Sequence, residues 1–411
     1  MNNSIFLSEA PNRIAAPDRP NIVALIGENE NGILRELSSG LMRTIEQDGY
    51  KGHIIDLYQP DWFANFLDIA RSGIAMAWGH AGVGARLSHE DENIWEFLKI
   101  PFVSVLADPP GRMPLNHYIR SRMVANAYVF SEWLDIQKRF IHAPQYSTLI
   151  NCVGVVPNKN RDVIPWRDRP QRMAFIKTGG NPEARRERWR DYPPRWRAIL
   201  EDASSAAVMQ GTGGINDLLF AACEQHGLQA DQRPEIILHL MEELDLYVRE
   251  YRMNTVVKAL LPLPVHIYGR GWDHLAALPA CAQFHPAFDA QNISTIYSAT
   301  QFLINTSPNI GSGMHERVAY GLDARCCVVS DENDFSRKIL NDIPTFFGFE
   351  ANSKNLTEYF FELYHDTTDY TEATQKGVDL ITHSFGGRSY MHELLNVAEE
   401  LQVADILSPL F

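Results

Sequence analysis

LINTSPNIGSGMHERVAYGLDARCCVVSDEN, residues 303–333, reads as a strand, a loop, a helix and a second strand. The loop contains Gly311 and Gly313, the helix is expected to start near Met314, and the second strand ends at Asp331. A strand, a helix and a strand in this order form the unit from which parallel sheets with helical crossovers are built. The stretch therefore predicts an α/β fold with a parallel sheet.

Short apolar runs rich in β-branched residues alternate with amphipathic stretches over most of the chain. Six runs are expected to form a first sheet: NIVALIG from Asn21, HIIDL from His53, GIAMAWG from Gly73, FVSVLAD from Phe102, AYVFS from Ala127 and LINCVGVV from Leu149. Five are expected to form a second: MAFI from Met173, VHIYG from Val265, AQFH from Ala282, QFLIN from Gln301 and CCVVS from Cys326. The alternation predicts two Rossmann-like, doubly wound domains.

The length of 411 residues exceeds what one hydrophobic core usually supports, so two domains are expected. The Pro- and Arg-rich stretch VIPWRDRPQR from Val163 is the predicted hinge. We assign residues 1–165 to the first domain, 166–388 to the second and 389–411 to a C-terminal helix. The first two predicted strands of the second domain lie too far apart for one crossover, which predicts a helical insertion at about 182–258.

Composition limits the class of protein. Hydrophobic residues make up 45% and charged residues 21%, which is typical of a globular chain. No apolar run reaches the roughly 20 residues of a membrane span, and the first twenty residues lack the zones of a signal peptide. We therefore expect a cytoplasmic protein without a transmembrane segment. The five cysteines have no metal-ligand spacing, so reduced thiols and no metal site are expected. The net charge of -14 argues against nucleic acid as a partner.

The loop before the predicted helix has the chemistry of an anion site. Glycines let backbone N–H groups approach a diphosphate closely, and a helix N-terminus adds partial positive charge. Arg317 is expected to pair with a phosphate, His315 to donate to a phosphate or sugar oxygen, and Glu316 to accept from ribose or sugar hydroxyls. The alternative is that Glu316 only complements the helix dipole while the other two form a solvated face.

From His315 to Asp331 the stretch resembles the donor-binding segment of bacterial GT-B glycosyltransferases related to the CgeB-like, spore-maturation group. In that group a glycine loop, a His-acid-Arg triplet and a helix precede a V-V-S-D strand end. Tyr320 stands where relatives carry Asn or Glu, and Arg325 stands where they usually carry Gly. The resemblance implies a GT-B fold, in which a nucleotide-diphosphate sugar binds between two Rossmann-like domains.

A shifted alignment makes Glu316 the ribose-binding carboxylate, with Gly321 at the later turn, and both alignments place the donor at this helix. The resemblance implies these donor-binding residues in the segment: Asn305, Gly311, Ser312, Gly313, Met314, His315, Glu316 and Arg317. YGRGW from Tyr268 is similar to a turn of the same group, which adds Tyr268, Arg270 and Trp272. IKTGGN from Ile176 adds Lys177 and Gly179 beside the diphosphate. For Tyr268 and Trp272 the alternative is an aromatic core, and for Lys177 an exposed loop.

The first domain is expected to bind the acceptor. FVSVLADPP from Phe102 resembles the family's strand that ends in Asp-Pro-Pro, and WGHAGVG from Trp78 places a histidine at another strand end. If transfer inverts the anomeric centre, Asp108 and His80 are the two candidates for the base; if it retains configuration, neither need act. Alternatively, Asp108 caps a turn and His80 forms a loop hydrogen bond. GENENG from Gly27 lacks the G-x-G-x-x-G spacing, so no dinucleotide cofactor is expected.

These observations predict a metal-independent glycosyltransferase without a cofactor, which moves a sugar from a nucleotide-diphosphate donor to a protein or glycan. Two alternatives stay open: a sugar-nucleotide epimerase on the same fold, and a non-catalytic binding module that acts through the helical insertion. The insertion is a candidate surface for an acceptor protein, a glycan or a second copy of the chain.

Overall fold

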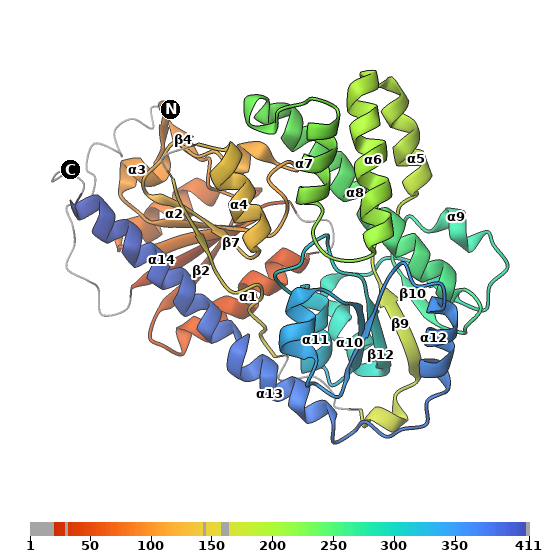
Figure 1. Cartoon of the computed structure of the whole chain (residues 1–411). Coiled ribbons are helices and arrows are strands. Elements are labelled where there is room, and N and C mark those ends of the chain that lie inside the picture. The colour runs from red at the N-terminus through yellow and green to blue at the C-terminus, as the bar shows by residue number, and fades with distance from the viewer. Residues whose placement is uncertain (1–19, 29–31, 143–144, 158–163, 408–411) are drawn as a thin grey trace.

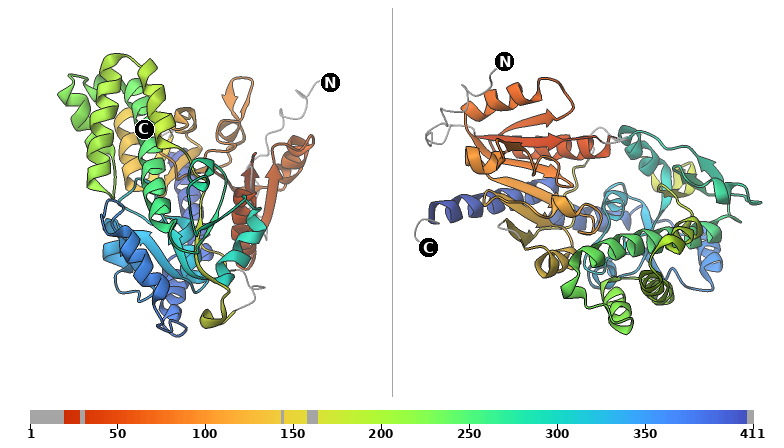
Figure 2. Two further views of the ribbon diagram at one scale, coloured as in Figure 1. Left: turned by 90° about the vertical axis from the view of Figure 1, so that its right-hand side faces the viewer. Right: turned by 90° about the horizontal axis from the view of Figure 1, so that it is seen from above.

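The computed structural model describes residues 20–28, 32–142, 145–157 and 164–407. The first nineteen residues and Val163, where the predicted hinge begins, lie outside the described residues. Figure 1 shows two lobes side by side, with helices of the middle of the chain grouped above the second lobe. Figure 2 shows the same group standing as a bundle of its own.

The first lobe is built on a six-stranded sheet in the order β2-β1-β3-β6-β7-β8. Every neighbouring pair in it is parallel. Its strands are β1 (Asn21–Ile26), β2 (Lys51–Asp56), β3 (Ile74–His80), β6 (Phe102–Leu106), β7 (Val124–Tyr128) and β8 (Tyr146–Leu149). Its helices are α1 (Ile33–Glu46), α2 (Trp62–Arg71), α3 (Ile94–Leu98) and α4 (Ser131–Phe140), and β4 (Ser88–His89) and β5 (Glu92–Asn93) form a small antiparallel pair.

The second lobe repeats this design in the order β11-β10-β9-β12-β13-β14, again with parallel pairs only. Its strands are β9 (Gln171–Ile176), β10 (His266–Tyr268), β11 (Gln283–His285), β12 (Thr300–Asn305), β13 (Cys327–Asp331) and β14 (Phe346–Phe349). Its helices are α9 (Asp273–Ala276), α10 (Ile293–Ala299), α11 (Glu316–Asp323), α12 (Leu356–His365) and α13 (Thr374–Ser384). The predicted class, two Rossmann-like domains, is confirmed. In this sheet β14 had no prediction, and in the first lobe β4, β5 and all of β8 except Leu149 had none.

Four helices stand between β9 and β10: α5 (Pro182–Arg188), α6 (Pro194–Gln210), α7 (Asn216–Gln225) and α8 (Pro234–Leu260). The first half of α8 packs in one core with the first lobe, where Leu240 and Met241 join Trp133. Its second half packs with the second sheet, where Val257 lies in one core with Phe302. Because α8 is buried in both cores, its position is fixed relative to both lobes.

The last helix, α14 (Gly387–Leu407), leaves the second lobe and lies along the first, as Figure 1 shows. Its buried residues include Met391 and Leu394, which belong to the first-lobe core. The apolar side of α14 is therefore explained by its packing against the first lobe.

The two segments that connect the lobes, one at Val155 and one at residues 385–387, are hydrogen-bonded to each other. Val155 N donates to Phe385 O at 2.7 Å, and Gly387 N donates to Val155 O at 2.7 Å. The strand predicted from Leu149 is therefore wrong beyond that residue, because β8 ends there. Val153 and Val155 are buried in the second-lobe core and not in the first sheet, so their apolar character reflects the buried crossing.

In the part of the chain that the structure describes, no helix combines the length and the apolar character needed to cross a membrane.

Candidate functional site

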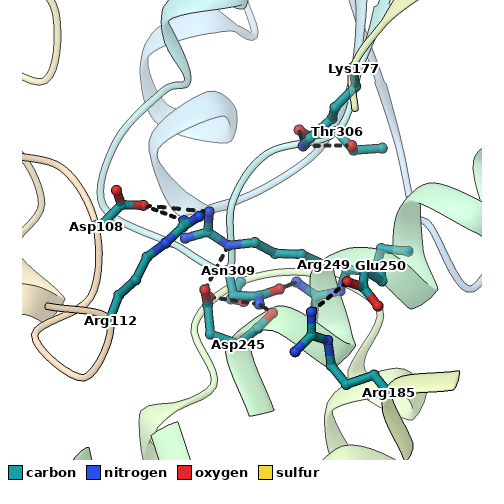
Figure 3. Close-up of polar contacts among 11 residues, drawn as sticks. Asp108, Arg112, Lys177, Arg185, Asp245, Arg249, Glu250, Thr306 and Asn309 are labelled. Carbon is teal, nitrogen blue, oxygen red and sulfur yellow. Dashed lines mark hydrogen bonds and ion pairs between the residues drawn. The ribbon is translucent and has the colours of Figure 1, made fainter. Parts of the chain in front are cut away.

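The second sheet changes direction of winding between β9 and β12, which are neighbours in it. In open α/β sheets, ligands bind outside the carboxyl ends of the strands at such a point. Lys177 directly follows β9, and Thr306 directly follows β12. The Lys177 ammonium donates to Thr306 O at 2.6 Å and to Thr306 Oγ1 at 3.0 Å (Figure 3). A basic side chain therefore spans the switch point.

A cavity of about 970 Å³ opens at this edge, between the second sheet and α1 of the first lobe. The second lobe contributes residues that follow three strands and the start of α11, among them Lys177, Thr178, Tyr268, Gly269, Phe288, Glu316, Arg317 and Tyr320. The first lobe contributes Glu36, Arg43 and Thr44 of α1, and Gln47, which caps this helix. Residues of both lobes thus line one cavity, with a volume in the range of small-molecule sites.

Lys177 is placed where its positive charge is poorly stabilised. Burial lowers the pKa of its ammonium well below the usual range, and the positive charges of Arg317 and Arg249 lower this pKa further. Asp331 opposes the effect, but its own carboxyl is buried, and burial raises its pKa. An anion bound beside Lys177 would offset this cost, because it would favour the charged ammonium.

The predicted triplet lies at the start of α11, which begins at Glu316 and not near Met314. His315 Nδ1 lies 3.0 Å from Glu316 Oε2, and His315 Nε2 lies 3.3 Å from Arg317 Nη1. With the proton on Nδ1, the ring donates to Glu316 and accepts from Arg317. Burial lowers the pKa of His315 to about 4, so the ring is neutral at pH 7. Although burial opposes it, the interaction with His315, which includes a side-chain hydrogen bond, and the positive charge of Arg317 hold the pKa of Glu316 below its usual value.

Glu316 and Arg317 line the cavity, so a carboxylate and a guanidinium of the predicted donor helix face it. His315 is not among the lining residues. It caps the helix instead, with Nδ1 3.2 Å from the backbone N–H of Arg317. This nitrogen can serve the backbone only as an acceptor and Glu316 only as a donor, so the two contacts belong to different tautomers.

The glycine loop before α11 contacts the first lobe. Gly311 N and Ser312 N donate to Glu132 Oε1 at 2.5 and 2.9 Å, and the Ser312 hydroxyl donates to the other oxygen of the same carboxylate. A side chain at Gly313 would lie 2.7 Å from the Phe130 ring. The backbone donors that we assigned to a diphosphate therefore hold a carboxylate of α4, and Gly313 allows the two lobes to approach.

The YGRGW turn, residues 268–272, packs against the loop that follows β9 and contains Lys177 and Gly179, here called the lysine loop. Gly269 and Gly271 have φ values of 136° and 80°, which favour glycine. Trp272 is buried and its indole Nε1 donates to Lys177 O at 2.9 Å, while a side chain at Gly179 would lie 2.4 Å from its ring. Tyr268 lines the cavity and stacks on His285 at 4.5 Å, whereas Arg270 is exposed.

Two further predicted donor residues are buried away from the cavity. Asn305 Nδ2 donates to Ser330 Oγ at 3.0 Å between neighbouring strands, and Met314 packs in the core around α11. Neither is among the residues that line the cavity.

The two candidate bases also lie outside the cavity lining. Asp108 Oδ1 accepts from Arg112 Nη1 at 2.9 Å and lies 3.8 Å from Arg249 Nη1 (Figure 3). His80 ends β3 next to the switch point of the first sheet, and its ring meets Trp78 edge-on at 5.0 Å. Burial lowers the pKa of His80 to about 4, which keeps the ring neutral at pH 7 but makes it a weak base.

Sequence reasoning missed Arg249 of α8, Glu132 of α4 and the polar side of α1. No local signal identifies the first two, because each is one charged residue among many on an amphipathic helix. The spacing of Glu36, Arg43 and Gln47 does place them on one side of α1, opposite the apolar residues that pack on the sheet. That pattern was available, but it cannot distinguish a solvated face from a cavity.

No family model and no curated protein matches this chain. Solved structures resemble it in overall fold, among them the following three. A glycosyltransferase from Rickettsia africae is 10% identical, with 94% of this chain and 99% of that chain covered and a TM-score of 0.43. HepE from Anabaena, in complex with UDP and glucose, is 11% identical, with 95% and 100% covered and a TM-score of 0.48. A sucrose-phosphate synthase from Thermosynechococcus elongatus is 10% identical, with 94% and 100% covered and a TM-score of 0.47.

Proposed function

We propose that this protein is a glycosyltransferase that binds a nucleotide-diphosphate sugar in the cavity between its lobes. One observation carries the proposal: two cations, Lys177 and Arg317, meet at the switch point of the second sheet, beside a cavity that both lobes line. Two adjacent cations match the two negative charges of a diphosphate.

The proposed roles follow from the positions. Arg317 and Lys177 bind the diphosphate and stabilise the negative charge that develops on it as the sugar leaves, so no metal ion is required. Glu316 accepts hydrogen bonds from ribose hydroxyls, and the ring of Tyr268 lies against the nucleoside. Tyr320, where relatives carry Asn or Glu, leaves Glu316 as the carboxylate that lines the second-lobe side of the cavity.

The acceptor, a protein or a glycan, would enter from the first lobe. Asp108 and His80 stay the candidates for a base, and Asp108 lies between Arg112 and Arg249. The assignment to the CgeB-like group is likewise part of the proposal and rests on the motif from His315 to Asp331.

The test is calorimetry with UDP, GDP and dTDP, first on the wild-type protein and then on Arg317→Ala. We expect one diphosphate to bind the wild type in the micromolar range, and the variant to bind it at least about tenfold more weakly, since one charge-assisted hydrogen bond contributes about 1.5–3 kcal/mol. Arg71→Ala, which removes an exposed arginine that does not line the cavity, should bind like the wild type. A wild-type protein of confirmed fold that binds none of the three contradicts the proposal.

Transfer itself is tested by mass spectrometry of the sugar nucleotide that matches the bound diphosphate. A glycosyltransferase incubated with donor alone releases the nucleoside diphosphate only slowly, by hydrolysis, and leaves the remaining donor unchanged. An epimerase converts the donor to an isomer without an acceptor. Formation of an isomer from the donor alone would show that the protein is an epimerase and contradict the proposed glycosyltransferase activity.

A further inference from the structure

Arg249 lies where the helical insertion meets the first lobe. Its Nε is 2.8 Å from Asp245 Oδ2, one turn earlier on α8, and its Nη1 is 3.8 Å from Asp108 Oδ1 (Figure 3). The side chain is only 16% exposed. A charged group in this position requires partners, because burial removes its hydration.

The partners of Arg249 are already shared with other groups. Asp108 accepts a hydrogen bond of 2.9 Å from Arg112, so its 3.8 Å contact with Arg249 is an ion pair beyond hydrogen-bond range. Asp245 Oδ1 accepts from Asn309 Nδ2 at 3.0 Å. Among the residues that the structure describes, the buried Nε and Nη2 of Arg249 have no hydrogen-bond partner, so the 2.8 Å contact of Nε with Asp245 Oδ2 is an ion pair without hydrogen-bond geometry. Its guanidinium therefore keeps unused donor capacity beside Asp108 of the first lobe.

Arg249 also belongs to the cations of the candidate site. After burial, the two charges that most oppose the protonated Lys177 are those of Arg317 and Arg249. These three cations come from three elements: the start of α11, the end of β9 and α8. Three like charges close together are unfavourable unless an anion binds among them, so their arrangement favours a ligand with more than one negative charge.

The geometry also indicates which part of the ligand Arg249 contacts. Lys177 and Arg317 line the cavity together with Tyr268, whereas Arg249 does not line it and points toward Asp108 of the first lobe. With the nucleoside at Tyr268, its phosphates would lie beside Lys177 and Arg317, and Arg249 adds a third positive charge on the side of Asp108. The phosphate farther from the nucleoside is then the one nearest to Arg249.

We propose that Arg249 binds the terminal phosphate of the donor's nucleoside diphosphate, which makes the helical insertion part of the donor site. This inference rests on the proposed function. The burial of α8 in both cores explains how an inserted helix can hold a guanidinium at a fixed place between the lobes.

The experiment compares nucleoside diphosphates with the matching monophosphates by calorimetry. UDP, GDP and dTDP identify the base, and the wild type, Arg249→Gln and Arg249→Lys are then titrated with that diphosphate and with its monophosphate. We expect Arg249→Gln to weaken diphosphate binding at least tenfold and monophosphate binding less than threefold. Arg249→Lys keeps the charge without the planar fork, so it should fall between the two.

Arg112→Gln is the matched control, because it removes the other guanidinium on Asp108 and should leave diphosphate affinity within threefold of the wild type. Diphosphate binding by Arg249→Gln within twofold of the wild type overturns this inference alone. An equal loss for diphosphate and monophosphate also overturns it, because the contact is then not with the terminal phosphate. If Arg249→Gln does not fold, Arg249→Lys decides: affinity for the diphosphate equal to the wild type overturns the inference. A wild type that binds no diphosphate overturns the proposed function itself.

Discussion

Glu132 Oε1 accepts a hydrogen bond of 2.5 Å from the backbone N–H of Gly311. A carboxylate of the first lobe is therefore hydrogen-bonded to the backbone of the second lobe. The same oxygen also accepts from Ser312 N at 2.9 Å. Successive backbone N–H groups form a concave site for anions, and here a side chain fills it. The contact joins the lobes at a point outside their two connecting segments.

Replacement of Glu132 should therefore loosen the association of the lobes. Glu132→Ala removes an acceptor of several hydrogen bonds, and we expect the free energy of unfolding to fall by about 2 kcal/mol. Glu132→Gln keeps one acceptor oxygen and should lose about half as much. Urea denaturation followed by tryptophan fluorescence measures both. Equal stability of Glu132→Ala and the wild type would show that the contact contributes nothing.

The affinity for a nucleoside diphosphate should fall as pH rises. Lys177 binds phosphate in its protonated form, and burial with Arg317 and Arg249 lowers the pKa of the free protein's ammonium. A bound diphosphate raises that pKa again, so binding takes up a proton in the range between the two values. Calorimetry in buffers of different ionisation enthalpy measures this uptake. Lys177→Met should bind more weakly and without proton uptake; uptake that persists in the variant assigns it to another group.

Stability should fall as the solution is acidified below pH 6.5, in part because of His80. Its pKa is about 4 in the folded protein and about 6.5 when exposed, so the unfolded chain binds the proton first. This contribution is fully present above pH 6.5 and is lost as pH falls toward 4. His80→Gln should reduce the slope of unfolding free energy against pH by up to about 1.4 kcal/mol per pH unit in this window. An unchanged slope in urea titrations between pH 4.5 and 6.5 contradicts the assignment.

Arg325 has a φ of 60°, in the left-handed region that favours glycine. The left-handed region costs a residue with a side chain about 1–2 kcal/mol. Arg325→Gly should therefore raise the free energy of unfolding by about 1 kcal/mol, despite loss of the contact from Arg325 Nη2 to Gln375 Oε1. Arg325→Ala is the control, because it loses the same contact and keeps the strain, and it should not be more stable than the wild type. Thermal melts of the three proteins compare them.

Gly179 lets the lysine loop pass over Trp272. A methyl group there would lie 2.4 Å from the indole, which must move and weaken its hydrogen bond to Lys177 O. Gly179→Ala should destabilise the protein by about 1–3 kcal/mol and reduce diphosphate affinity. Gly214→Ala is the matched control, because the nearest atom to its added methyl lies at 3.9 Å. Equal stability of the two variants would contradict the close packing.

The strands and the donor helix could be predicted because their signals are local. Ten of the eleven predicted strands match strands of the structure, and the glycine loop with its polar triplet located the start of α11 within two residues. The prediction of a strand from Leu149 was wrong because an apolar segment that crosses between two lobes is buried as deeply as a strand. Its hydrogen bonds with residues 385–387 depend on a segment more than two hundred positions later, which periodicity does not reveal.

The sequence by itself determined two parallel sheets, the insertion of helices into the second domain and the polar residues at the start of α11. Only the tertiary structure decided that Glu132 holds the glycine loop, that α1 lines the cavity and that the charge of Arg249 acts on Lys177. The physical reason is that hydrophobic periodicity specifies which face of each element is buried, but not which distant element covers it. Those choices depend on how the lobes and the inserted helix pack against one another, and that packing brings the charges of the candidate site together.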